Sequence, residues 1–327
     1  MQHSNTSSDK PTIKHQDIKI IILNSNLKEA AIDKALKEKI YNTSQKWAVF
    51  LKWLLLSMGI GLTVSSIIFF FAYNWDALHK FVKIGIIQGL VVAVTLCTLL
   101  LKINKTVQQI ILTGAALLVG VLFAVFGQIY QTGANAYDFF LAWCIFISIW
   151  VFISNFSALW LLYLILINTT IYLYYEQVAQ LWSFPLLCII LFAVNSIAII
   201  GMITKAYIEK VEVQAIWLQY IFSLAAIFFA TLGFIWSVMS DIYFELIIIT
   251  LFTLISYTLG IIYALIKQRI FYLAIIPLSC IINICSIIIR YMRTEESILL
   301  VAFFIVASIT GTIFTLLHFQ KKWNYGK

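Results

Sequence analysis

Two polar segments, each at the end of an apolar run, hold the side chains best suited to binding in this chain of 327 residues. The first follows Tyr73 and the second runs from Gly127 to Asp138. Their amide and carboxylate oxygens, with aromatic rings beside them, are typical of a shallow site for a cation, a sugar-like ligand or a partner protein. We call this the external site, because the orientation argued below puts it outside the cell. Its candidate residues are Asn74, Trp75, Asp76, Gln128, Tyr130 and Asp138.

The same residues also suit the ends of helices. Asn74 tolerates the left-handed conformation that ends a helix, and Asp76 and Asp138 can each accept hydrogen bonds at the start of the next one. Trp75 and Tyr130 would then belong to the aromatic belt at the membrane interface. The sequence leaves both interpretations open.

A second group of polar residues lies inside the apolar runs. It consists of neutral side chains at Gln88, Asn168, Asn195 and Asn283. They could line a polar groove, or they could form pairwise hydrogen bonds between neighbouring helices. A groove requires all of them to face one cavity. In a separate pattern, Ala116, Gly120 and Ala124 repeat every four residues, which predicts a small-residue face open to close helix contact.

Catalytic and metal-binding patterns are missing from the sequence. There is no HExxH, no GxSxG and no glycine loop for phosphate. The four histidines lie in tails or at the ends of apolar runs, and the five cysteines lie inside those runs without a CxxC pair. We therefore expect no cofactor and no metal, and lean against an enzyme. No ionisable residue falls in the middle of a run, which also disfavours ion-coupled transport.

The composition requires a lipid solvent for most of the chain. Hydrophobic residues make up 62% and charged residues 11% of it, against about 25% charged in soluble domains. The formal net charge of +8 does not indicate nucleic-acid binding, because the basic residues are spread between apolar runs rather than along one face. The bilayer is the expected partner.

Ten apolar runs are long enough to cross a bilayer, which takes about 20 helical residues. The predicted fold is therefore all-α, a polytopic transmembrane helix bundle. Its spans are 53–73, 81–101, 109–129, 138–154, 158–175, 184–204, 216–238, 242–266, 270–289 and 297–319. The fourth and fifth are the shortest and could instead form a tight hairpin, so the count could fall to eight.

The distribution of lysine and arginine predicts the orientation. With the N-terminus in the cytoplasm, the inner segments hold 18 of these residues and the outer segments hold Lys80, Lys83, Arg290 and Arg293. An excess on the inside is the expected asymmetry. We predict a multi-pass protein of a bacterial cytoplasmic (inner) membrane, with both termini in the cytoplasm.

Five segments follow from this organisation. The segment from 17 to 46 is amphipathic, with Ile32, Leu36 and Ile40 on one stripe, and is predicted to form a short cytosolic helix. The segments are a flexible N-terminal tail (1–16), the cytosolic helical segment (17–46), a first membrane region (47–176), a second membrane region (177–319) and a cytosolic tail (320–327).

A family resemblance rests on the two polar segments. The stretches FFFAYNWDALHKFVKIGI (69–86) and GAALLVGVLFAVFGQIYQTGANAYDFFLAW (114–143) resemble a bacterial family of membrane proteins, domain of unknown function 2157. The matching positions are Tyr73, Asn74, Trp75, Asp76, Gly127, Gln128, Tyr130, Gly133 and Trp143. The resemblance is clearest from Trp47 to Glu176. It implies a membrane architecture but assigns no activity.

Two functional hypotheses follow. The first is a structural, assembly or sensory membrane component with partner contacts at the external loops or the cytosolic helix, or with a second copy of itself. The alternative is a facilitator or binder of a neutral or lipidic solute, through a groove lined by the intramembrane amides. Coordinates distinguish the two, because a groove gathers those amides and a scaffold scatters them.

Overall fold

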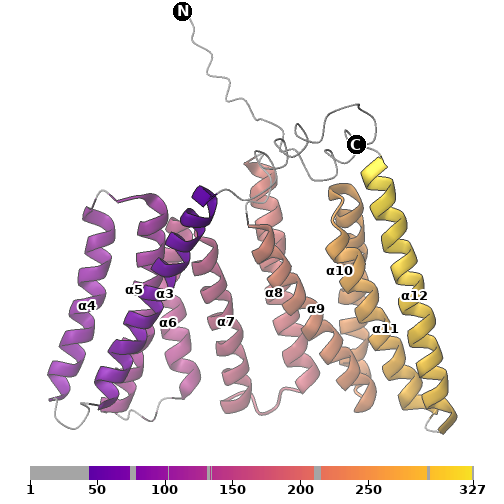
Figure 1. Ribbon diagram of the computed structural model, residues 1–327. Helices are drawn as coiled ribbons and strands as arrows, with labels where there is room; N and C mark the ends of the chain where they lie inside the picture. The colour runs from indigo at the N-terminus through magenta and orange to yellow at the C-terminus, as the bar shows by residue number, and fades with distance from the viewer. Residues whose placement is uncertain are drawn as a thin grey trace, which may run out of the picture. The chain divides into compact units, whose positions relative to one another are not determined.

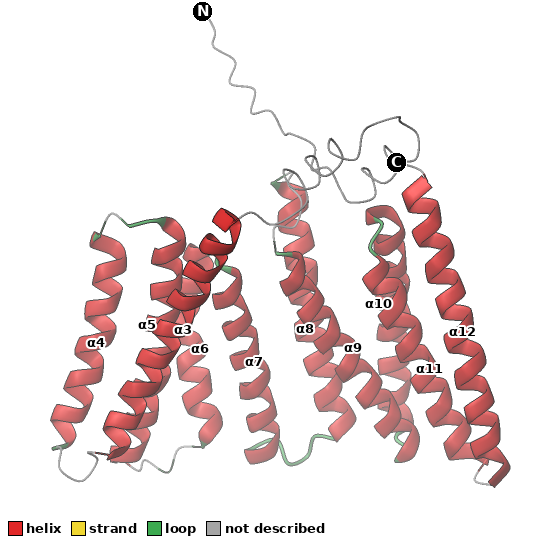
Figure 2. Ribbon diagram, viewed as in Figure 1, coloured by secondary structure: helices red, strands yellow, loops and turns green. Residues whose placement is uncertain are grey.

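The computed structural model describes residues 44–73, 79–101, 103–130, 133, 135–209, 215–292 and 295–325. Helices account for most of them, and these residues include no strand (Figure 2). The predicted cytosolic helix lies outside the described residues except for its last three positions, which belong to the helix that follows.

Ten helices within this part of the chain are long and apolar enough to cross a membrane. They correspond one to one with the ten predicted spans and confirm the all-α polytopic fold. Their bounds are α3 Ser44–Tyr73, α4 Lys80–Leu100, α5 Lys105–Tyr130, α6 Ala136–Ser154, α7 Ser157–Gln177, α8 Phe184–Ile208, α9 Ile216–Met239, α10 Tyr243–Lys267, α11 Ile270–Met292 and α12 Glu295–Tyr325.

The two short predicted spans are separate helices of membrane length. Helix α6 has 19 residues and α7 has 21. Asn155 ends α6 in the left-handed conformation, with φ 48°, a geometry that asparagine adopts more readily than most residues. The tight turn therefore joins two full spans, and the count of ten holds.

The chain divides into two compact units, residues 1–78 and 79–327. Helix α3 is the described part of the first unit. Along it, the hydroxyls of Thr63, Ser65 and Ser66 donate to the carbonyls of the residues four positions earlier. These local bonds satisfy the three hydroxyls within their own helix, as a hydrocarbon environment demands.

The second unit is a row of helices in which most chain neighbours pack together (Figure 1). Helix α4 packs on α5, α5 on α6 and α6 on α7, while α9 contacts α8, α10 and α11. Half of the most apolar stretch of α9 is buried, which makes it the centre of the C-terminal group. Gly233 allows the close approach there, since a Cβ on it would lie 2.6 Å from Ile249 Cδ1 and 2.7 Å from Cys188 Cβ.

Two contacts that involve charged side chains in the second unit lie at helix ends. Arg290, in the last turn of α11, pairs with Asp241, which lies between α9 and α10. The Ser183 hydroxyl donates to the Glu245 carboxylate at 2.9 Å and also accepts from the Leu186 amide at the start of α8. Charged side chains held at helix ends suit a transmembrane position, because a charge at the bilayer centre is costly.

Candidate functional site

A pocket of about 400 Å³ lies between the last turns of α5 and the first turns of α6. Small residues and aromatic rings make up nearly all of its wall. It is lined by Gly120, Phe123, Ala124, Gly127, Gln128, Gly133, Ala136, Phe139, Phe140 and Trp143. No ionisable side chain is among these lining residues.

Glycines on α5 create the room into which the rings of α6 fit. A Cβ on Gly120 would lie 2.4 Å from the Trp143 ring, and one on Gly127 would lie 2.5 Å from the Phe139 ring. The indole N–H of Trp143 donates to the Ala116 carbonyl at 2.7 Å, which fixes the ring in this position. The predicted small-residue face of α5 does permit close approach, and aromatic side chains rather than backbone fill the space.

Gln128 supplies the polar chemistry of the pocket. Its amide offers both a donor and an acceptor, and its side chain is exposed rather than covered by the helices. Gly133, next along the wall, has φ +67°, a conformation that favours glycine and turns the chain from α5 toward α6. The pocket therefore combines apolar walls with one neutral amide close to the end of α5.

The other external candidates have different positions. The carboxylate of Asp138 accepts from the Asn135 backbone N–H at 3.1 Å, so it caps the start of α6. The Tyr130 ring lies against the Phe126 ring in a tilted arrangement, with ring centres 4.6 Å apart, and does not line the pocket. Asn74, Trp75 and Asp76 lie outside the described residues. Of the candidates that the structure describes, Gln128 alone lines the pocket.

The four intramembrane amides do not share one cavity. Asn168 and Asn195 bond to each other between α7 and α8. Gln88 is exposed on α4, and Asn283 is buried in α11, where its Oδ1 has no hydrogen-bond partner. None of them lines the α5–α6 pocket.

A smaller cavity, lined in part by polar side chains, lies among α8, α9, α10 and α11. Gln219, Ser223, Tyr257, Tyr263 and Tyr272 line a cavity there. Sequence reasoning passed over these residues, although Gln219 and Ser223 are four positions apart and so share one face of a helix. Among the described residues, no group of three or more His, Cys, Asp or Glu side chains could hold a metal ion.

The α5–α6 pocket lies in the part of the chain that matches a known protein family. Residues 24–160 match the family described as Predicted membrane protein (DUF2157). The resemblance seen in the sequence is thereby confirmed for this range, which we call the DUF2157 region. The DUF2157 region begins before α3, at residue 24, and ends in the first turn of α7. Searches of curated proteins and of solved structures found no match.

The pocket lies wholly inside the DUF2157 region. Gly127, Gln128, Gly133 and Trp143, four of the residues that carry the resemblance, all line it. Residues of the second polar segment thus form part of the pocket wall, and others form the start of α6. Helices α8 to α12 lie beyond the matched range.

Proposed function

We propose that this multi-pass membrane protein binds a neutral, lipid-soluble ligand in the α5–α6 pocket of its DUF2157 region. The observation that carries the proposal is the pocket itself, about 400 Å³ in volume, with aromatic walls and a single amide at Gln128. Ligand pockets in proteins commonly measure about 300–1,000 Å³, with mostly apolar linings and few polar groups.

The chemistry of the wall selects the ligand class. A charged ligand would find no opposite charge among the lining residues, and an unpaired charge away from water is strongly disfavoured. An apolar chain or ring can lie against Phe123, Phe140 and Trp143, while a hydroxyl, ester or amide group bonds to Gln128. A lipid-like molecule with a neutral polar end fits both requirements.

The four intramembrane amides do not form the groove expected of a solute facilitator, and their scattering is what a scaffold was expected to show. The proposal therefore assigns a neutral ligand to the α5–α6 pocket instead of that groove. The scaffold hypothesis expected partner contacts at the external loops or the cytosolic helix. The loop around Asp76 and most of that helix lie outside the described residues, while Gly127, Gln128 and Gly133 of the second polar segment line the pocket. The two hypotheses join if the bound ligand changes how α6 packs on α5, because the pocket adjoins the contact between Gly120 and Trp143. A sensory membrane component would work in this way.

Photolabelling tests the proposal. The protein in nanodiscs is exposed to a diazirine-bearing fatty alcohol, and labelled peptides are mapped by mass spectrometry. We expect labelling concentrated on the wall residues of α5 and α6, with competition by the unlabelled alcohol. Ala124→Leu, which adds bulk to an exposed wall position, should abolish this labelling.

The matched control is Ala302→Leu, because Ala302 is equally exposed on α12 and lies away from the pocket. It should leave the labelling of α5 and α6 unchanged. Labelling spread evenly over the exposed surfaces of all helices, and equal in the two variants, would mean that the alcohol acts only as bulk lipid and would reject the proposal.

We also infer a cytoplasmic (inner) membrane of a bacterium, with both termini inside. The inference is supported by the excess of lysine and arginine in the segments assigned to the inside, 18 against four. Ten spans return the C-terminus to the side of the N-terminus. In this orientation the α5–α6 pocket faces the outer leaflet.

A further inference from the structure

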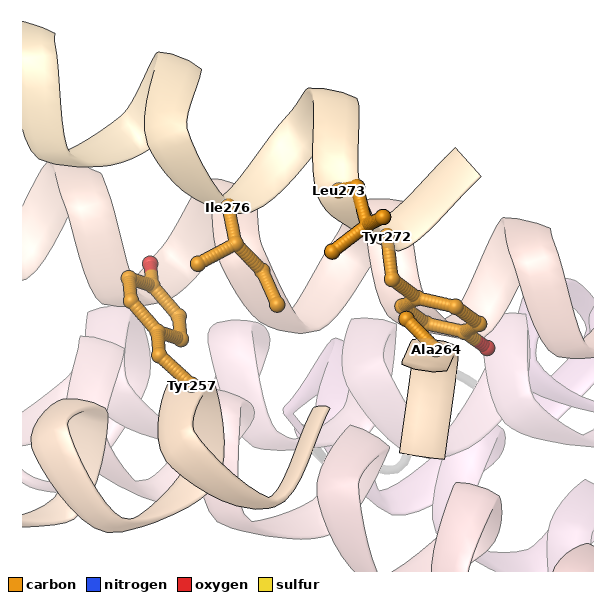
Figure 3. Close-up of a cluster of buried hydrophobic side chains, with 5 residues drawn as sticks. All are labelled: Tyr257, Ala264, Tyr272, Leu273 and Ile276. Carbon is orange, nitrogen blue, oxygen red and sulfur yellow. The ribbon is translucent and has the colours of Figure 1, made fainter. Parts of the chain in front are cut away.

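The cavity among α8, α9, α10 and α11 is separate from the DUF2157 region. Its volume is about 150 Å³. Figure 3 shows part of its wall, with Tyr257 on α10 and Tyr272 and Ile276 on α11. Most of the lining is aliphatic or aromatic, and the polar groups come from tyrosine, serine and glutamine.

Gln219 carries the one polar atom of this wall that is buried without a partner in the described structure. The residue is 2% exposed, and its Nε2 donates no hydrogen bond. Its Oε1 lies 3.5 Å from the Tyr263 hydroxyl. A buried donor left unpaired destabilises a protein appreciably, so the amide favours an occupant that accepts a hydrogen bond.

Three hydroxyls of the wall, those of Ser223, Tyr257 and Tyr272, already have partners within the protein. Tyr272 Oη lies 3.0 Å from Ser223 Oγ, which in turn donates to the backbone carbonyl of Gln219 at 2.7 Å. Tyr257 Oη lies 2.7 Å from Ser279 Oγ. These bonds hold the rings of Tyr257 and Tyr272 in place as walls, and Gln219, whose Nε2 has no hydrogen-bond partner, lines the same cavity.

Part of the cavity wall is exposed on the surface of the helices. Ile200 of α8 and Leu259 of α10 both line it and are each 59% exposed. A solute can therefore reach the cavity from the bilayer, between α8 and α10, without crossing a charged surface. The volume matches that of an apolar cavity known to hold benzene, about 150 Å³.

We propose that this cavity is a second binding site, for a small neutral solute of roughly the bulk of benzene that accepts a hydrogen bond from Gln219 Nε2. Carbonyl and ether compounds dissolved in the bilayer have this chemistry. The site does not depend on the ligand proposed for the α5–α6 pocket, because the two cavities share no lining residue.

Two probes of matched shape test the site. Cyclohexanone presents a carbonyl acceptor, and methylenecyclohexane replaces that oxygen with a CH₂ group. Binding to the full chain in nanodiscs is measured by ligand-observed NMR titration, with empty nanodiscs subtracted. We expect saturable binding of cyclohexanone about tenfold tighter than that of methylenecyclohexane, as one hydrogen bond to a buried amide would give.

Variants test whether Gln219 causes the difference in affinity between the two probes. Gln219→Met keeps the length of the side chain but removes the donor, and should weaken cyclohexanone binding to the level of the hydrocarbon. Gln320→Met makes the same change at an exposed position on α12 and should bind like the unaltered protein. Ser196→Leu fills the opposite wall on α8 and should reduce the binding of both probes, which keeps the test valid if Gln219→Met fails to fold.

Several results would overturn the proposal. Equal affinity for the two probes, or unchanged cyclohexanone binding in Ser196→Leu, would remove the site. A cavity that binds neither probe saturably, with only ordered water on Gln219 Nε2 in an experimental structure, would be a hydrated void. Labelling of the α5–α6 pocket by the fatty alcohol is expected to persist in Gln219→Met, so failure at one site is distinguishable from failure at the other.

Discussion

Asn195 donates a hydrogen bond from its Nδ2 to Asn168 Oδ1 at 2.8 Å, across the contact between α7 and α8. The reverse contact, from Asn168 Nδ2 to Asn195 Oδ1, measures 3.5 Å. Each amide also donates to the carbonyl four residues earlier in its own helix, Leu164 or Leu191. The pair thus satisfies both side chains in a region where Asn195 is fully buried, and it links α7 to α8.

Removing one asparagine of the pair should lower the stability of the protein. We expect Asn195→Leu to destabilise the protein by about 1–2 kcal/mol, because the Asn168 amide loses its interhelical partner in an apolar setting. The double variant with Asn168→Leu should be less destabilised than the sum of the two single variants. Thermal unfolding in detergent measures all four proteins, and the coupling should be about 0.6–1.7 kcal/mol.

A control change checks that the effect is interhelical. Thr250→Val removes a hydroxyl that bonds only within its own helix, to the Leu246 carbonyl, and it should shift stability little. Strict additivity of the two asparagine substitutions would show that the amides do not act together.

Gly120 should reject even one added methyl group. A Cβ there would lie 2.4 Å from the Trp143 ring, which its hydrogen bond to Ala116 holds in place. Gly120→Ala is therefore expected to destabilise the protein by about 1–3 kcal/mol through overpacking. Detergent unfolding is the measurement, and Trp143→Phe in the same background should recover part of the loss.

Gly89 offers the matched comparison, since a Cβ on it would meet nothing within 4 Å. Alanine favours helices over glycine by about 1 kcal/mol, so Gly89→Ala should be neutral or stabilising. The same response from both glycine variants would contradict a close contact between α5 and the Trp143 ring.

The fold followed from the sequence because hydrocarbon imposes a length and excludes charge. Long, largely apolar runs such as 242–266 left the helix as the way to satisfy the backbone. The direction in which a side chain faces could not be derived in the same way. Helices that are apolar all round have no distinct polar face to orient them, so Gln88 and Gln219 looked alike although one is exposed and the other buried.

The external candidate site was only partly predictable for a related reason. Asp138 and Gln128 are both polar residues near helix ends, but their neighbours decide their roles. Asn135 stands three positions before Asp138 and makes it a cap, whereas the glycine at 127 opens a space beside Gln128 that Phe139 borders. That space depends on ring positions in α6, which no spacing rule within α5 could supply.

The pair between Arg290 and Asp241 should contribute modestly to stability. It joins α11 to the connection between α9 and α10, and the Asp241 side chain is 46% exposed. Asp241→Asn removes the charge but still tolerates the positive φ of 55° found there. We expect a loss of about 1 kcal/mol or less, shrinking as salt is added. Unfolding at low and high ionic strength measures this.

Glu209→Gln is the reference variant for Asp241→Asn. Lys205 and Glu209 are four positions apart on one helix, their charged atoms are 3.8 Å apart, and both side chains are about half exposed. Glu209→Gln should have a smaller effect than Asp241→Asn at low salt. If Asp241→Asn changes nothing at any ionic strength, the ion pair does not hold α11 in place.

Reporter fusions after Lys105, Lys210 and Lys322 test the orientation of the chain. The lysines and arginines near these points fall in segments assigned to the cytoplasm, and retained positive charge is what orients such proteins. All three fusions should therefore report a cytoplasmic position, whereas a fusion after Gln131, between α5 and α6, should report the outside. A periplasmic signal from any of the first three would reverse or break the assigned order of spans. It would also move the mouth of the α5–α6 pocket away from the outer leaflet, where the proposed ligand is expected to bind.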